Sequence, residues 1–153
     1  MIDKYQSLTV EIARIGRYIK RIKTKEVAEI DPCLKGPHIS CLYYIYKSNG
    51  TLTAKEITSI CDEDKASISR SIEFLENNGY ITCNCQNEKR YNSSLFLTEK
   101  GTIISEKITN KIDEIVDLTG IGLSEENRLN FYKTLFLISS NLKNIFDNYG
   151  DEN

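Results

Sequence analysis

The apolar and polar positions from residue 51 to residue 101 predict two short helices, a tight turn and a two-stranded ribbon. Thr53 and Glu56 have the spacing of a capping box, which predicts that the first helix begins at Ala54. An acidic break, Asp62-Glu63-Asp64, separates this helix from a longer one. The apolar residues of the longer helix recur at helical spacing and should form its buried face: Ile68, Ile72 and Leu75.

The rest of this segment completes the pattern of a winged helix-turn-helix. The inner face of the first helix is expected to contain Ile57, Ile60 and Cys61. Asn78-Gly79 should end the second helix. Alternation then predicts a strand from Tyr80 with three residues on one face: Ile81, Cys83 and Cys85. A return strand is expected over residues 92–97, after a charged tip at residues 87–91.

The outer face of the longer helix carries polar side chains that suit a nucleic-acid groove. They are Lys65, Ser67, Ser69 and Arg70. Short hydroxyl side chains let a helix approach the base edges, and an arginine can reach a phosphate or a guanine. We therefore expect this helix to be the recognition helix of a DNA-binding protein.

Two helices are expected before this centre. Residues from Leu8 to Lys25 should form one helix, because their apolar positions alternate by four and three residues: Leu8, Ile12, Ile15, Ile19 and Ile22. Residues 31–37 contain two prolines and a glycine and should form a loop. A helix is expected to return from His38 to Tyr46.

Two long helices should close the chain. Thr98 is expected to cap the first of them, with Gly101 in its first turn and one apolar side: Ile104, Ile108, Ile112 and Ile115. That helix should end at Gly120-Ile121-Gly122. The last helix opens near Leu123 and carries a second apolar seam: Phe131, Leu135, Ile138, Leu142 and Phe146.

The expected fold is mainly α with a small β wing. Its parts are dimerisation helices at 1–30 and 123–149, a winged helix-turn-helix at 38–101 and a linking helix at 98–119. A subunit of 153 residues is too small to bury both terminal seams by itself, which favours a two-fold homodimer over packing within one subunit. Such a dimer would place two recognition helices about 34 Å apart and bind an inverted repeat of double-stranded DNA.

The charge balance argues against a nonspecific nucleic-acid binder. The formal net charge is -2, and residues 53–100 hold six Lys/Arg against eight Asp/Glu. DNA binding must therefore depend on where the cations are placed. Residues 14–25 are rich in Lys and Arg, and we favour a solvated helix face over a contact with the DNA backbone there.

The motifs described above resemble those of the MarR family of bacterial transcription regulators. The resemblance rests on LTAKEI, DKASISRSIEFLENNGYI, EKR and LFLTEKG, which together cover about a third of the chain. It implies a DNA-binding dimer, most often a repressor, whose activity commonly responds to small aromatic ligands or to cysteine oxidation. Constitutive repression without a ligand is the alternative. Two positions depart from the pattern: Glu88 replaces the usual Asp, and Ala66 stands where a hydroxyl residue is common.

Seven residues are the candidates for DNA contact: Thr53, Lys65, Ser67, Ser69, Arg70, Lys89 and Arg90. Thr53 is expected to cap its helix and to contact a phosphate. The helix residues should face the major groove, and Lys89 and Arg90 at the wing tip should enter a narrow minor groove. Which of these two makes the contact remains open.

Candidate residues for a small aromatic ligand are His38, Tyr43 and Tyr46. His38 is the only histidine and lies at a loop-to-helix junction. A surface or helix-capping role for His38 is the favoured interpretation.

The cysteines give little sign of a metal or redox site. Cys83 and Cys85 are two residues apart, about 7 Å along an extended strand, which is awkward for a disulfide. The sequence has no CxxC motif, and Cys61 does not supply enough further ligands for a tetrahedral site. We expect these cysteines to be small buried apolar residues, and we expect no metal and no cofactor.

Other classes of protein fit the sequence less well. No apolar run is long enough for a membrane span, and the N-terminus lacks a signal-peptide layout, so a cytoplasmic location is expected. No phosphate-binding loop or nucleophile with a base is visible, which disfavours an enzyme. The alternative is a winged-helix module that binds protein and not DNA.

Overall fold

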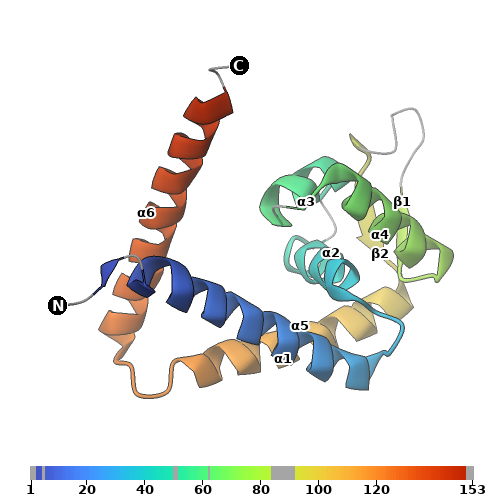
Figure 1. The fold of residues 1–153 in the computed structure, drawn as a ribbon. Helices are drawn as coiled ribbons and strands as arrows, with labels where there is room; N and C mark the ends of the chain where they lie inside the picture. Colours follow the sequence, from blue (N-terminus) through green and yellow to red (C-terminus); the bar gives the residue numbers. More distant parts are fainter. Residues whose placement is uncertain (1–2, 5, 50–51, 62, 84–91, 151–153) are drawn as a thin grey trace. The chain divides into compact units, whose positions relative to one another are not determined.

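The computed structural model describes residues 3–4, 6–49, 52–61, 63–83 and 92–150 of the chain (Figure 1). These form two compact units, residues 1–115 and residues 116–153, which are described separately. The elements in order are a π-helical segment Gln6–Val10, α1 Glu11–Ile30, α2 Gly36–Lys47, α3 Ala54–Cys61, α4 Lys65–Asn77, β1 Ile81–Cys83, β2 Leu95–Leu97, α5 Glu99–Thr119 and α6 Glu125–Gly150.

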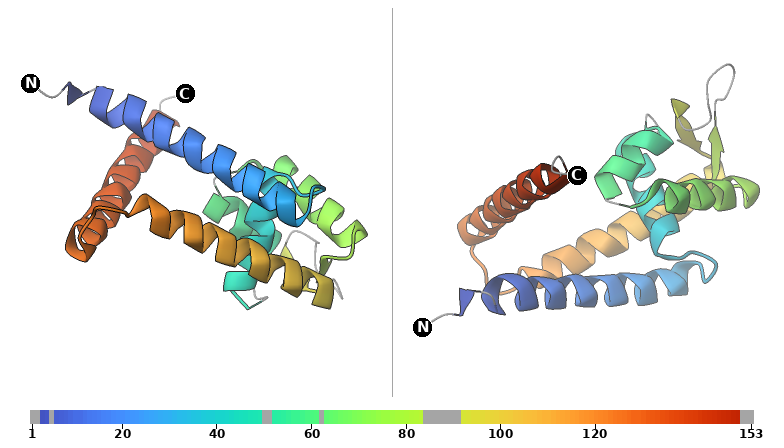
Figure 2. Two further views of the ribbon diagram at one scale, coloured as in Figure 1. Left: turned by 90° about the horizontal axis from the view of Figure 1, so that it is seen from below. Right: turned by 45° about the horizontal axis from the view of Figure 1, so that its top comes forward.

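The core of the first unit lies between α2, α3, α4 and the hairpin. Its fully buried side chains come from all of these elements: Ile39, Leu42, Ile45, Ile57, Ile68, Leu75, Ile81 and Leu95. Val27 of α1 and Ile108 of α5 join the same cluster, and Lys111 Nζ of α5 lies 3.7 Å from Glu26 Oε2 of α1. Figure 2 shows the courses of these two helices. The predicted apolar faces of α4 and α5 therefore do form part of one core.

Both ends of α4 follow the sequence prediction. The Asp64 carboxylate caps the helix by accepting the backbone N–H of Ser67 at 2.8 Å. At the other end Tyr80 N–H bonds the Leu75 carbonyl and Gly79 N–H bonds the Glu76 carbonyl, which is a Schellman motif. Gly79 has a φ of 71°, a conformation that favours glycine.

The hairpin pairs β1 with β2 in antiparallel register, Ile81 opposite Leu97 and Cys83 opposite Leu95. The return strand β2 is shorter than the predicted range 92–97, and the residues at its start also bond a different segment. Leu95 N–H bonds the Leu52 carbonyl, and Ser94 bridges to Thr53 just before α3. The base of the wing is thereby attached to the start of α3.

The helix α5 begins as predicted. Thr98 Oγ1 accepts the backbone N–H of Gly101 at 3.0 Å and donates to the Gly79 carbonyl at 2.6 Å. On the predicted apolar side Ile108 and Ile115 are buried, and the other two isoleucines are half-buried.

The end of α1, the start of α2 and the buried face of α3 also differ from the prediction. The first helix continues to Ile30, and α2 begins at Gly36 because Pro37 fits the first turn, where its missing N–H is not needed. Ile60 is 47% exposed and not part of the core. The buried face of the short helix α3 instead runs through Ala54 and Ile57 toward the half-buried Cys61.

In the second unit, Ser124 caps α6 by accepting the N–H of Asn127 at 3.2 Å. Arg128 lies 3.6 Å from Asp117 across the turn that joins α5 to α6. Large apolar side chains on this helix are exposed on more than the predicted seam: Leu129, Phe131, Tyr132, Phe136, Leu137, Leu142, Ile145, Phe146 and Tyr149.

Among the described residues, no helix is both long and apolar enough to cross a bilayer.

Candidate nucleic-acid interface

The outer face of α4 presents the predicted polar residues. Lys65, Ser69 and Arg70 are exposed, and Ser67 is half-buried. They stand opposite the buried side of the same helix, which is fixed in the core by Ile68 and Leu75. The helix therefore offers a rigid polar surface on which the short side chains of Ser67 and Ser69 lie between the longer ones of Lys65 and Arg70.

Ser67 is less exposed than Lys65 and Ser69, and its backbone is bonded on both sides. Its backbone N–H is used by the Asp64 cap, and its carbonyl accepts the hydroxyl of the buried Ser71 at 2.9 Å. These bonds fix the first turn of α4.

Thr53 has the capping role that the sequence predicted. Its hydroxyl donates to Glu56 Oε2 at 2.8 Å and accepts the Glu56 N–H at 3.2 Å, while its own N–H donates to Glu56 Oε2. Hydrogen bonds from the Thr53 backbone and side chain lower the pKa of Glu56. Since the hydroxyl proton is used in the cap, a bond from Thr53 to a phosphate would require this arrangement to open. The phosphate contact stays a prediction.

Lys89, Arg90 and Cys85 lie outside the described residues.

His38 occupies the capping position that was favoured over ligand binding. Its Nδ1 accepts the backbone N–H of Lys35 at 3.1 Å, at the start of α2. Its ring stacks on Phe74 of α4, with centroids 4.2 Å apart and planes 4° from parallel. Burial, and next the nearby Lys35, lower the pKa of His38.

This arrangement predicts a pH-dependent stability. A lowered pKa in the folded state means that the stabilisation is complete above the ordinary pKa of histidine and is lost as pH falls through the folded pKa. We expect the Tm to decrease between about pH 7 and pH 5.5, with that decrease removed in His38→Gln, which keeps an acceptor but does not titrate. Thermal unfolding followed by circular dichroism at several pH values tests this. If the Tm of the wild type and that of His38→Gln changed with pH in parallel, the prediction would be contradicted.

The two tyrosines proposed with His38 have other neighbours. The Tyr43 ring stands edge-on to Tyr44 at 5.2 Å, and Lys47 Nζ lies 5.6 Å from its centroid. Tyr46, one turn further along, is half-buried.

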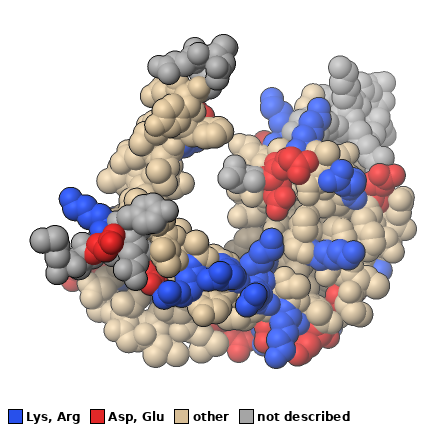
Figure 3. All heavy atoms as spheres, viewed as in Figure 1, with Lys and Arg blue, Asp and Glu red and all other residues tan. Residues whose placement is uncertain are grey.

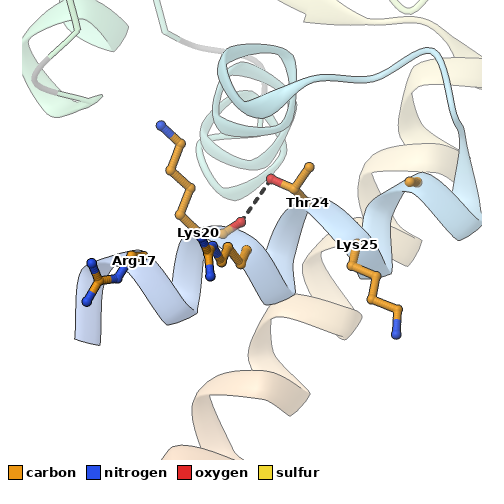
Figure 4. Close-up of a pocket in the computed structure, with 6 residues that line it drawn as sticks. Arg17, Lys20, Thr24 and Lys25 are labelled. Atoms are coloured by element: carbon orange, nitrogen blue, oxygen red, sulfur yellow. Dashed lines mark hydrogen bonds between the residues drawn. The ribbon is translucent and has the colours of Figure 1, made fainter. Parts of the chain in front are cut away.

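Cations gather along α1, where Figure 3 shows a blue surface. Residues 12–25 contain six Lys/Arg and no Asp or Glu. An open hollow of about 600 Å³ is lined by Arg17, Lys20, Arg21, Thr24, Lys25 and Ala28, and by none of the three predicted ligand residues. In Figure 4 the side chains of Lys20 and Lys25 extend in different directions. Arg17, Lys20, Arg21 and Lys25 are all exposed, which agrees both with a solvated face and with a contact to the DNA backbone, so the preference for a solvated face stays a prediction.

The expected state of Cys83 was wrong. Cys83, the last residue of β1, is disulfide-bonded, so the strand spacing did not exclude a disulfide at this position. Cys41 is buried, and burial raises the pKa of its thiol to about 12. Burial likewise raises the pKa of the Cys61 thiol to about 11. Among the described residues no group of three His, Cys, Asp or Glu could hold a metal.

The fold agrees with that of several solved structures of low sequence identity. A MarR-family regulator from Neisseria meningitidis, NMB1585, superposes with a TM-score of 0.80 at 18% identity, covering 95% of this chain and 98% of that one. The MepR–DNA complex of S. aureus gives 0.77 at 20% identity over 92% and 99%. The organohalide-sensing regulator RdhR-CbdbA1625, in a form bound to 2,4-dichlorophenol, gives 0.74 at 17% identity over 92% and 82%. Neither the protein-family models nor the curated proteins gave a match.

The helices and hairpin thus define a winged helix-turn-helix protein. Over 95% and 92% of its length, respectively, the chain has the fold seen in NMB1585 and in the MepR–DNA complex.

Proposed function

We propose that this protein is a MarR-family transcriptional regulator, most simply a repressor, that binds an inverted-repeat operator. The observation that carries the proposal is the exposed polar face of α4, held between an Asp64 cap and a Schellman motif beside a hairpin. The similarity to the MepR–DNA complex supports this role for the fold. Lys65, Ser69 and Arg70 would contact the major groove, and Lys89 and Arg90 a minor groove.

We further propose that the protein works as a homodimer built from segments 1–30 and 123–149. The predicted seam of α1 is exposed along the chain: Leu8, Ile12, Ile15, Ile19 and Ile22. Among the described residues, α6 exposes nine large apolar side chains, five of which are aromatic. Contiguous apolar surface of this extent is uncommon on a monomer and suits a second copy, which also fits the two-fold symmetry of an inverted repeat.

An effector is proposed as a small aromatic ligand or an oxidant of thiols. The dichlorophenol-bound relative supports the first kind. His38, Tyr43 and Tyr46 remain candidate contacts, although the imidazole of His38 is already bonded to Lys35 and stacked on Phe74. An added aromatic acid or peroxide should weaken operator binding in the assay described next.

The test is fluorescence anisotropy with the protein's own upstream DNA and with scrambled DNA, across a salt series. Arg70→Ala should weaken operator binding more than binding to scrambled DNA. Lys89→Ala with Arg90→Ala should weaken both and reduce the salt slope by about 0.9 for each phosphate that is no longer neutralised. Lys107→Glu changes the net charge by the same two units at an exposed position of α5 and serves as the charge-matched control.

A protein-binding module is the competing function. In that case the wild type would bind both DNAs weakly and equally, and the wing-tip variant would leave partner binding unchanged. Equal binding together with an empty genome-wide pull-down of DNA would overturn the proposed function.

A further inference from the structure

We infer that Tyr80 and Asp31 are a positioning pair that sets the angle of the recognition helix α4 relative to α1. The inference rests on the proposed function, since it assigns these two residues a part in operator selectivity. Neither residue was among the candidates for DNA contact.

Tyr80 lies where four elements meet. Its N–H closes the Schellman motif of α4 by bonding the Leu75 carbonyl at 2.8 Å, and the next residue begins β1. Its carbonyl accepts the N–H of Thr98 at 3.0 Å, at the start of α5. Its hydroxyl donates to Asp31 Oδ2, at the end of α1. Tyr80 is 3% exposed, so its hydroxyl needs such a partner.

Asp31 is held on both carboxylate oxygens. It is the C-cap residue of α1, where its backbone N–H bonds the Val27 carbonyl at 2.9 Å. Its Oδ1 accepts the backbone N–H of Cys33 at 3.0 Å, and its Oδ2 accepts the hydroxyl of Tyr80. A carboxylate at the negative end of a helix is unfavourable by itself, so its hydrogen bonds must account for its presence there.

Two neighbouring contacts hold the same end of α4. His38, seven residues beyond Asp31, stacks on Phe74 in the last turn of α4. From α5, Lys100 Nζ donates to the Asn78 carbonyl at 2.9 Å and lies 3.9 Å from the centroid of the Tyr80 ring. The C-terminal end of α4 is therefore fixed from two sides, and the exposed Lys65 and Ser69 lie nearer its other end.

A small rotation about this fixed end matters for base contacts. A helix of 13 residues is about 20 Å long, so a tilt of about 10° moves its first turn by about 3 Å. That displacement exceeds the tolerance of a hydrogen bond to a base edge. Long flexible side chains can still reach phosphates, so selectivity should fall while nonspecific binding persists.

The experiment compares Tyr80→Phe, Asp31→Asn and the double variant with the wild type by anisotropy on operator and scrambled DNA. Tyr80→Phe removes only the hydroxyl, and an asparagine cannot supply both carboxylate acceptors. We expect each single variant to lose about tenfold in operator affinity, with unchanged affinity and salt slope on scrambled DNA. The double variant should lose no more than either single one, because both remove one interaction. Tyr44→Phe, which removes the hydroxyl of a half-buried tyrosine of α2, is the control.

Equal losses on both DNAs, or a lower Tm with unchanged selectivity, would show a structural role only and overturn the inference. If the wild type itself shows no selectivity, the proposed function fails instead. In that case amide hydrogen exchange tests whether the bond between Tyr80 and Asp31 holds the C-terminal end of α4. Faster exchange at residues 79 and 80 in Tyr80→Phe supports it, and unchanged exchange overturns it.

Discussion

Gly101→Ala is expected to destabilise the protein by about 3 kcal/mol, at the upper end of what overpacking a core commonly costs. A Cβ at this position would lie 1.8 Å from the Tyr80 carbonyl oxygen and 2.8 Å from its carbonyl carbon. Both atoms are backbone, so no side-chain rotation can relieve the overlap. The first turn of α5 or the chain after α4 must move, and the gain in helix propensity from alanine, about 1 kcal/mol, is too small to compensate.

Gly16→Ala is the matched control for this substitution. Gly16 lies in the middle of α1, and nothing lies within 4 Å of the position of its added Cβ. The same chemical change should therefore stabilise the protein by about 0.5–1 kcal/mol.

Thermal unfolding followed by circular dichroism measures both variants. For a chain of this size, a loss of about 3 kcal/mol should lower Tm by roughly 6–12 °C. Because the displaced atoms belong to Tyr80, Gly101→Ala should also reduce operator selectivity at temperatures where it remains folded. A Tm within 1–2 °C of the wild type, a range that on the same scale is under about 1 kcal/mol, would contradict the close approach of α5 to Tyr80.

Local sequence signals predicted the helix ends that carry the site. The Thr53 cap and the Asn78-Gly79 ending depend on residues within about four positions of one another, so a pattern search finds them. The face of α3 was misjudged at Ile60, because two helical turns contain too few apolar positions to fix the buried direction.

A search for local sequence patterns could not find the contacts that we propose orient α4. Asp31 and Tyr80 are 49 positions apart, and His38 meets Phe74 only after α2 and α4 have packed together. Nothing in the surrounding motif distinguishes Tyr80 from an ordinary apolar residue that follows a helix. The disulfide at Cys83 was missed for a different reason, since an ideal strand spacing was taken to exclude it.

Leu142→Glu with Phe146→Glu is expected to convert the protein to a monomer and to lower operator affinity by at least about 100-fold, the range that loss of a second linked binding site produces. In the chain Leu142 is 52% exposed and Phe146 is 76% exposed. In a two-fold dimer each substitution occurs twice, so four apolar side chains are removed, worth about 8 kcal/mol at about 2 kcal/mol each. Four carboxylates would also face an apolar interface.

Asn141→Glu with Asn144→Glu adds the same charge to exposed polar positions of the same helix and should leave the dimer intact. Analytical ultracentrifugation gives the mass of each variant, and anisotropy on operator DNA gives its affinity. A monomer that still binds the operator at wild-type affinity would rule out dimeric recognition of an inverted repeat. If the Leu142 and Phe146 variant is still a dimer, α6 is not the interface. The exposed apolar seam of α1 would then be the remaining candidate. Equal dissociation by both double variants would attribute the effect to added charge, not to loss of apolar surface.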